Sequence, residues 1–165
     1  MQKISTFLWF DDQAEEAANY YVSVFSTKPG ASPGGSKILD LLRYGEAGPG
    51  EVGTVMTVSF QLDGQEFTAL NGGPEYTFNE AVSIVVNCET QEEVDDLWDR
   101  LSDGGEEGPC GWLKDRFGLW WQINPTVLSE MQRDPNPAKS QAAMKAMLGM
   151  GKIEIAGLRR AYDAA

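Results

Sequence analysis

The sequence predicts an α+β protein made of two βαβββ modules followed by C-terminal helices. Three observations carry this prediction. Apolar and polar residues alternate in several short segments, each half of the chain has one amphipathic segment with helical spacing, and the order of segments recurs. The second copy is shorter, and only two strands are readable after its helix.

The first module begins with an expected strand at residues 4–10, which is rich in aromatic and β-favouring residues. Asp11 and Asp12 are expected to cap the helix that follows. One face of this helix is apolar and carries Ala14, Ala17, Ala18, Tyr21 and Phe25. Three more strands are expected at residues 37–44, 53–62 and 65–70, and Asp63-Gly64 predicts a tight hairpin between the last two.

The second module begins with an expected β-branched strand at residues 81–88. Thr90 and Glu93 predict a capping box. The helix that follows carries an apolar stripe of Val94, Leu97, Trp98 and Leu101, and Gly104-Gly105 ends it. Two strands are expected at residues 110–114 and 119–123.

Pro125 ends this pattern, and two short helices are expected at residues 138–148 and 153–162. We therefore predict one domain over residues 1–125, with modules of about 1–75 and 76–125. Residues 126–165 are predicted to form a helical extension that packs on the same domain or on a dimer partner.

Composition narrows the class of partner. The 165 residues carry 13 basic and 25 acidic side chains, a net charge of 13 − 25 = −12. This balance disfavours nucleic acid and anionic membrane surfaces, because binding phosphate requires a basic face. Two cysteines are too few for a disulfide framework, and no apolar run reaches the ~18 residues of a membrane span. A cytoplasmic location is expected.

The stretch from Asp115 to Gln122 has the form D-x-x-G-x-x-x-Q, and the chain contains no histidine. It resembles the last strand turn of metal-dependent enzymes of the glyoxalase type, which end this motif in a metal-binding glutamate. A neutral amide is a poor ligand for a catalytic transition metal, and imidazole is the commonest one. The motif therefore indicates the fold, while the missing ligands argue against its usual chemistry.

Longer stretches resemble the PhnB-like family of the vicinal oxygen chelate superfamily, which includes glyoxalase I, extradiol dioxygenases and bleomycin-resistance proteins. The stretches are FLWFDDQAEEAANYY, GTVMTVSFQLDGQEFTALNGGP, FNEAVS, CGWLKDRFGLWWQINP and DPNPAKSQAAMKAML. The resemblance implies the glyoxalase/bleomycin resistance/dihydroxybiphenyl dioxygenase fold, with modules that curl around a cavity in a homodimer. It also brings the label 3-demethylubiquinone-9 3-methyltransferase. The sequence does not support that label, because no glycine-rich turn that would suit S-adenosylmethionine leads from a strand into a helix.

The resemblance places the superfamily's four metal-ligand positions at Ser5, Phe67, Ala81 and Gln122, or at Thr6, Asn71 and Glu80 after a shift of one or two residues. No register supplies three good ligands among histidine and carboxylates, so we expect no metal and no other cofactor. An atypical divalent metal site, with Glu80, Gln122 and water, stays open as an alternative.

Five residues are candidates for a ligand pocket: Trp9, Asn71, Ser83, Trp120 and Gln122. Polar groups in an apolar pocket orient a ligand, and indoles stack on planar molecules. Trp120 and Gln122 have the same strand parity and should face the same side, whereas Trp98 and Trp121 are expected in the core. The competing interpretation is that the polar residues satisfy backbone groups at strand ends.

Glu75 and Glu80 flank the linker between the modules, where they could serve as acid and base or as weak metal ligands, although a solvated loop is the preferred interpretation. Cys110 is expected to be an inert thiol. The sequence thus predicts a PhnB-like protein whose aromatic cavity binds a small planar or apolar molecule without metal. The alternatives are a lyase, isomerase or dioxygenase with an atypical metal site, and a methyltransferase.

Overall fold

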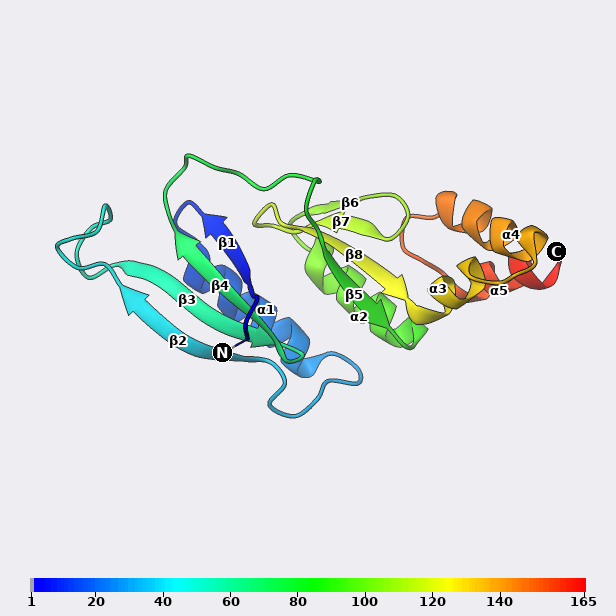
Figure 1. Cartoon of the computed structure of the whole chain (residues 1–165), viewed down its shortest axis with the longest axis horizontal. Helices are drawn as coiled ribbons and strands as arrows, with labels where there is room; N and C mark the ends of the chain where they lie inside the picture. Colours follow the sequence, from blue (N-terminus) through cyan, green and yellow to red (C-terminus); the bar gives the residue numbers. More distant parts are fainter. Residues whose placement is uncertain (1) are drawn as a thin grey trace. The chain divides into compact units, whose positions relative to one another are not determined.

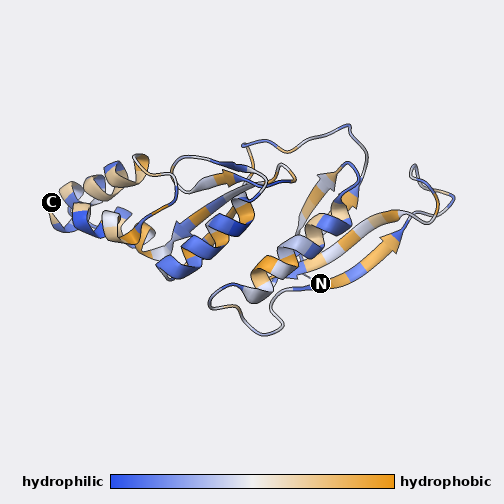
Figure 2. Cartoon of the chain, turned by 180° about the vertical axis from the view of Figure 1, so that it is seen from behind, coloured by the Kyte–Doolittle hydropathy of each residue, from blue (hydrophilic) through white to orange (hydrophobic). Residues whose placement is uncertain are grey.

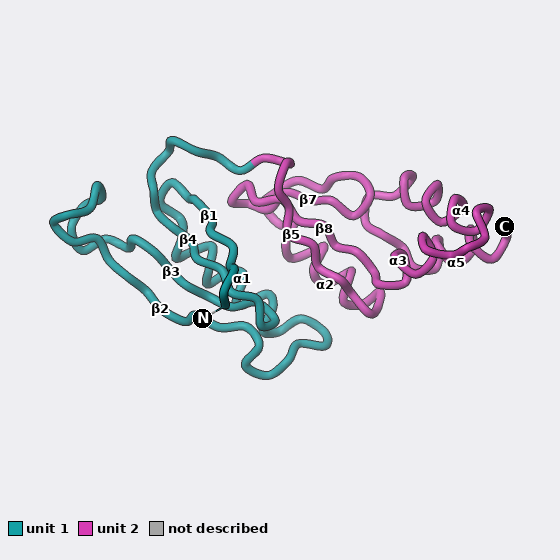
Figure 3. The backbone as a smooth tube through the Cα atoms, in the orientation of Figure 1, with its two compact units in different colours: residues 1–78 teal, residues 79–165 magenta. Residues whose placement is uncertain are grey.

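The computed structural model describes residues 2–165 and contains two compact units, residues 1–78 and 79–165 (Figures 1 and 3). Each unit holds one four-stranded mixed sheet with a helix packed on one face. The predicted α+β class and the repeated module are therefore confirmed. None of the helices in residues 2–165 is long and apolar enough to cross a membrane.

The first unit contains β1 (Thr6–Phe10), α1 (Ala14–Thr27), β2 (Lys37–Arg43), β3 (Val55–Leu62) and β4 (Gln65–Asn71). The strand order is β1-β4-β3-β2, and β1 runs parallel to β4 while the other pairs are antiparallel. Leu62 pairs with Gln65 across a two-residue turn, in which Asp63 and Gly64 have φ angles of 44° and 88°. This turn confirms the predicted hairpin.

Helix α1 covers one face of the first sheet with the predicted apolar residues and with Val24. The Tyr21 ring lies 6.2 Å from that of Phe60, which stacks on Phe67 at 5.3 Å. Along β3 the buried Val58, Phe60 and Leu62 alternate with Ser59 and Gln61. Hydrophobic and hydrophilic residues both occur along the strands of the sheet (Figure 2). The face away from α1 stays open, and Phe7 on it is 61% exposed.

The start of α1 differs from the prediction. Neither Asp11 nor Asp12 caps the helix, because the N-cap residue is Gln13 and its side chain makes no capping hydrogen bond. The backbone N–H of Ala14 instead donates to Oδ1 of Asn71 at 2.8 Å. A residue at the end of β4 thus satisfies a helix donor that would otherwise lack a partner.

The second unit contains β5 (Ile84–Cys88), α2 (Gln91–Ser102), β6 (Glu106–Glu107), β7 (Trp112–Lys114) and β8 (Trp120–Pro125), with strand order β5-β8-β7-β6. The predicted cap is present, because Thr90 Oγ1 accepts the Glu93 N–H, while the Glu93 carboxylate accepts the N–H of Glu89, one residue before the N-cap. The predicted start of the first strand at residue 81 is wrong, since β5 begins three residues later.

Three helices follow: α3 (Thr126–Gln132), α4 (Pro137–Leu148) and α5 (Ile155–Asp163). The sequence predicted the last two and missed α3. They share a small core of Leu128, Met131, Ala143, Ile153 and Leu158. The Gln91 side chain links α2 to the start of α5, because it donates to the carbonyl of Ile153 and accepts the N–H of Ile155.

The Asp95–Lys152 ion pair, at 2.9 Å, adds a pH-dependent tie between α2 and the segment before α5. The hydrogen bond from Lys152 lowers the pKa of Asp95, and the same bond raises the pKa of Lys152. Because the pKa of Asp95 is lower in the folded than in the unfolded protein, its ion pair stabilises the fold fully at pH values above the unfolded pKa of Asp95. This stabilisation is lost as the pH falls through the folded pKa of Asp95. The pKa of Lys152 is higher in the folded than in the unfolded protein, so its stabilising contribution is fully present below the unfolded pKa of Lys152. This contribution is lost as the pH rises through the folded pKa.

We therefore expect Lys152→Met to lower the free energy of unfolding at pH 7 by less than about 0.5 kcal/mol, because both side chains are partly exposed. The difference from wild type should vanish as the carboxyl is protonated. Urea unfolding at pH 7 and at pH ~3 measures it. If Lys152→Met and wild type still differed in unfolding free energy by the same amount at pH ~3, the ion pair would not be the source of the difference.

Candidate functional site

Strand β8 carries the predicted site residues on its half-exposed side. Trp121 and Ile123 point towards α2 and are buried, whereas Trp120, Gln122 and Asn124 alternate with them and are partly exposed. The predicted shared face of Trp120 and Gln122 and the predicted burial of Trp98 and Trp121 are therefore confirmed. We call the side away from α2 the open face of the second sheet. Its residues are Ser83, Val85, Asn87, Trp112, Lys114, Trp120, Gln122 and Asn124.

Gln122 occupies the centre of this open face. Its register partners are Val85 on β5 and Trp112 on β7, and residues directly opposite in register project from the same face. Val85 is 48% exposed. Gln122 therefore stands between an apolar side chain and an indole, both accessible to a ligand.

A hydrogen bond of 2.9 Å joins Gln122 Nε2 to Ser83 Oγ. Ser83 directly precedes β5, so the bond crosses diagonally from the start of that strand to β8. The structure thus brings together three predicted pocket residues, Ser83, Trp120 and Gln122, on one face of the second unit.

Two indoles frame this polar pair. The rings of Trp112 and Trp120 are 6.4 Å apart at 64°, in an edge-to-face arrangement. Lys114 Nζ lies 5.8 Å from the centre of the Trp120 ring, and it also pairs with Glu106 at 2.6 Å. The charge of Lys114 is therefore matched by a neighbouring carboxylate.

The turn before β8 is fixed by Asp115, whose side chain is buried at 1% exposure. Its Oδ1 accepts the N–H groups of Phe117 and Leu119, and its Oδ2 accepts the indole N–H of Trp121. Gly118 completes the turn with a positive φ of 88°, which glycine adopts readily. This network sets the direction in which β8 leaves the turn, and hence where Trp120 and Gln122 point.

Trp9 and Asn71 belong to the first unit. The Trp9 indole donates to the carbonyl of Gly73 at 2.9 Å, and its ring meets that of Tyr76 edge-on at 5.0 Å. A Cβ on Gly72 would lie 2.3 Å from the Trp9 ring, so only glycine fits there. Trp9 is thus clamped on the open face of its own sheet.

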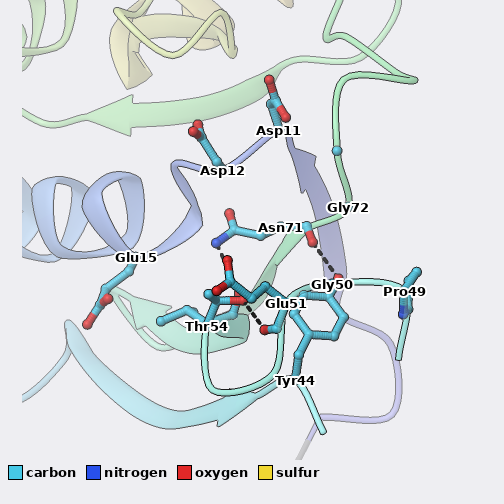
Figure 4. A pocket seen from close by; sticks show the side chains of 12 residues that line it. Asp11, Asp12, Glu15, Tyr44, Pro49, Gly50, Glu51, Thr54, Asn71 and Gly72 are labelled. Carbon is cyan, nitrogen blue, oxygen red and sulfur yellow. Dashed lines mark hydrogen bonds between the residues drawn. The ribbon is translucent and has the colours of Figure 1, made fainter. Parts of the chain in front are cut away.

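Asn71 lines a pocket of about 520 Å³ in the first unit (Figure 4). Both polar atoms of its side chain are engaged, since Oδ1 accepts from Ala14 and Nδ2 donates to the carbonyl of Val55. Four carboxylates also line the pocket: Asp11, Asp12, Glu15 and Glu51. No lysine or arginine is among the lining residues, so the pocket is acidic.

Glu75 and Glu80 lie exposed between the two sheets in sequence, and within the described part of the chain neither has an ion pair or a side-chain hydrogen bond. Over residues 2–165, no group of three or more histidine, cysteine, aspartate or glutamate side chains is arranged to hold a metal ion. The role proposed for these two carboxylates stays a prediction.

A family model described as 3-demethylubiquinone-9 3-methyltransferase matches residues 2–124. The chain belongs to this family. The PhnB protein of Bacillus cereus, itself described with that methyltransferase name, is 38% identical, with a TM-score of 0.63 over 76% of this chain and 100% of that chain. No curated protein matches the PhnB-like chain.

Two more distant structures show the fold. Protein PA1353 from Pseudomonas aeruginosa is 20% identical, with a TM-score of 0.59 over 76% of the PhnB-like chain and 98% of its own. The fosfomycin resistance protein FosX from Listeria monocytogenes is 15% identical, with a TM-score of 0.51 over 79% and 97%. The PhnB-like chain therefore has the predicted glyoxalase/bleomycin resistance fold.

The structure corrects the expected register of the superfamily's ligand positions in the PhnB-like chain. Ala81 lies before β5, and the residue paired with Gln122 is Val85. Ser5 lies just outside β1, where Thr6 pairs with Phe67. The residues in register with Gln122 are Val85 and Trp112, which supply no metal ligand, so the oxygen donors here are the Gln122 amide and the Ser83 hydroxyl. This donor set does not suit a transition metal.

Proposed function

We propose that this PhnB-like protein binds a small planar molecule in an aromatic cavity built on the open face of the second sheet, without a metal ion. One observation carries the proposal. Gln122 stands at the centre of this face between Val85 and Trp112, bonded to Ser83, with Trp120 beside it. Ligand sites typically combine apolar walls with a few polar groups that orient the ligand.

Binding by stacking suits these residues. An indole offers a large rigid surface at a low cost in side-chain entropy. The edge-to-face contact between Trp112 and Trp120 sets the two ring planes at 64°, so a flat molecule would stack on the face of one indole. In the first unit, Trp9 is proposed to offer an indole on the open face of its own sheet, and Asn71 to line the acidic pocket of that unit.

We expect Trp120→Ala to weaken binding of a planar ligand about tenfold, ~1.4 kcal/mol, because one stacking surface is removed. A screen of phenolics, quinones and glycopeptides by tryptophan fluorescence and melting temperature supplies the ligand. The matched control is Leu148→Ala, which truncates an exposed apolar side chain on α4 and should leave affinity unchanged. The proposal fails if no compound shifts the melting temperature, or if both variants bind as wild type does.

The first alternative is a lyase, isomerase or dioxygenase with an oxygen-ligand metal site at Glu80 and Gln122, and with Glu75 as a further candidate acid or base. Metal content of the untagged protein, with melting curves against nickel, zinc, manganese and ferrous iron, decides it. A stoichiometric metal, or a rise of several degrees with one ion, would favour this alternative over metal-free binding.

The second alternative is the methyl transfer that the family description names. The nearest glycine cluster is Asn71-Gly72-Gly73-Pro74, and its amides are already used. The N–H of Gly72 donates to the carbonyl of Phe10, and that of Gly73 to the carbonyl of Asp11. These amides are therefore not free for a nucleoside cofactor. Calorimetry with S-adenosylmethionine tests this alternative, and saturable heat would support it.

We also propose a cytoplasmic homodimer. The first unit exposes large apolar side chains, among them Phe7 at 61% and Leu42 at 50%, and such groups often mark protein interfaces. Two free cysteines suit a reducing compartment. Light scattering during gel filtration measures the mass, and a monomer at micromolar concentration would refute the dimer.

A further inference from the structure

The Gln122–Ser83 pair has hydrogen-bonding groups left over after the bond between the two side chains. Gln122 Nε2 donates to Ser83 Oγ, and among residues 2–165 neither side chain makes another hydrogen bond. The carboxamide oxygen of Gln122 is therefore a free acceptor, and the hydroxyl hydrogen of Ser83 is a free donor. The pair presents one acceptor and one donor side by side on the open face of the second sheet.

This pattern does not depend on how the amide is oriented. If the carboxamide is turned over, its oxygen accepts the Ser83 hydroxyl hydrogen and its NH₂ group faces outward. The free edge then consists of the amide donor and a lone pair of Ser83 Oγ. Either orientation offers one donor beside one acceptor, so a matching ligand must present the complementary two groups.

The surroundings specify the rest of the ligand. The register partners of Gln122 are apolar or aromatic, and Trp120 lies beside it, so the body of the ligand is flat and apolar. The one cationic side chain on this face, Lys114, is paired with Glu106. The other polar residues of the face, Asn87 and Asn124, are neutral. An ionised ligand would lose hydration here without gaining an unpaired opposite charge.

We propose that the ligand of this site is a neutral planar ring that carries an N–H and a C=O on adjacent atoms, that is, a cyclic amide. The inference rests on the proposed function and names its ligand class. The lactam N–H donates to the free acceptor of the Gln122–Ser83 pair while the lactam carbonyl accepts from its free donor. Gln122 is then a specificity-determining residue.

The same pattern of one donor and one acceptor predicts weaker binding for other classes of planar ligand. A lactone or quinone has carbonyl acceptors and no N–H, so it leaves the protein's acceptor unpaired. A carboxylate has only acceptors and carries a charge. A plain aromatic hydrocarbon satisfies neither group. Each unpaired partner in a partly dehydrated site weakens binding, and a typical hydrogen bond contributes about 0.5–1.5 kcal/mol net.

The test compares 2-quinolinone with N-methyl-2-quinolinone, which lacks the donor, and with coumarin, which has a ring oxygen in place of N–H. Binding to the full chain is followed by quenching of tryptophan fluorescence and by calorimetry. We expect 2-quinolinone to bind about tenfold more tightly than either analogue. All three share the flat bicyclic body, so stacking alone predicts equal affinities.

Two variants assign the preference to Gln122. In Gln122→Leu the preference for 2-quinolinone should fall to about onefold, while weak stacking of all three compounds persists. In Gln122→Glu the carboxylate accepts from Ser83 and leaves only acceptors outward, so the lactam should lose affinity through repulsion at its carbonyl. Gln141→Leu, on the exposed side of α4, is the matched control and should keep the tenfold preference.

The outcomes separate the two proposals. Equal binding of the three compounds to the wild type would overturn the lactam inference and leave metal-free planar binding intact. A preference that survives in Gln122→Leu would also overturn it. If none of the compounds, nor any other planar molecule of the screen, binds to the folded protein, the proposed function fails as well.

Discussion

Replacing Asp115 with alanine is expected to lower the free energy of unfolding by about 3–5 kcal/mol, a large part of the ~5–15 kcal/mol typical of a domain. The buried carboxylate accepts three N–H groups, from Phe117, Leu119 and the Trp121 indole. Alanine removes the acceptor of these three N–H groups, and each buried hydrogen-bonding group that loses its acceptor costs about 1–3 kcal/mol. Urea unfolding followed by fluorescence measures the loss.

Asp115→Asn separates charge from geometry. The amide oxygen can replace Oδ1 for the two backbone donors, but its NH₂ group would then face the indole N–H of Trp121. We expect an intermediate loss of about 2 kcal/mol. Asp103→Ala is the control, because its ion pair with Arg116 is largely exposed and should contribute less than ~1 kcal/mol. Equal effects of Asp115→Ala and Asp103→Ala would refute the role assigned to the turn.

The consequence of Asp115→Ala for binding follows from its position. Residues 115–119 form the turn from which β8 leaves, so a loosened turn changes where Trp120 and Gln122 point. We therefore expect the folded fraction of this variant to bind planar ligands more weakly than wild type, although Asp115 is buried and touches no ligand. Asp115 is a positioning residue in this sense.

Local signals explain which features the sequence could predict. The Asp63-Gly64 turn and the Thr90–Glu93 cap depend on side chains and backbone within a few residues, and both are present. The separation of Trp120 from Trp121 depends only on strand alternation, which places successive side chains on opposite faces. These local signals predict single elements, whereas the fold as a whole was predicted from the resemblance to the PhnB-like family.

Features set by distant partners could not be predicted in this way. The extent of β5 is decided by its neighbour, because its pairing with β8 begins only at Ile84, opposite Trp121. Strand β6 has only two residues, too few for any alternation to be seen. Helix α3 follows Pro125 without a gap, so the proline that indicated an end of regular structure is the N-cap of the next helix.

The candidate site was predictable in part for the same reason. Parity placed Trp120 and Gln122 on one face, but the bond from Gln122 to Ser83 spans 39 residues and depends on the register of β5 against β8. Only the register of β7 against β8 shows that Trp112 stands directly opposite Gln122. A pairing of this kind has no local sequence signal.

Asn71→Ala is expected to destabilise the first unit by about 2–3 kcal/mol, because Asn71 joins three elements. Its Oδ1 accepts the first helical N–H of α1, at Ala14, and its Nδ2 donates to the carbonyl of Val55 on β3. Its main-chain carbonyl accepts the hydroxyl of Tyr44 at 2.5 Å, a bond that alanine can keep. Loss of a helix cap alone costs about 1 kcal/mol, and the unpaired Val55 carbonyl adds to it.

Two comparisons distinguish this role from ligand binding at the acidic pocket. Asn71→Asp keeps the acceptor for Ala14 but sets a carboxylate against the Val55 carbonyl, so it should restore part of the cap and still unfold more easily than wild type. Asn19→Ala, which removes an exposed amide on α1, should change the free energy of unfolding by less than about 0.5 kcal/mol. If Asn71→Ala is as stable as Asn19→Ala, the amide is free to serve a ligand, and the pocket in Figure 4 becomes the better location for the pocket role predicted for Asn71.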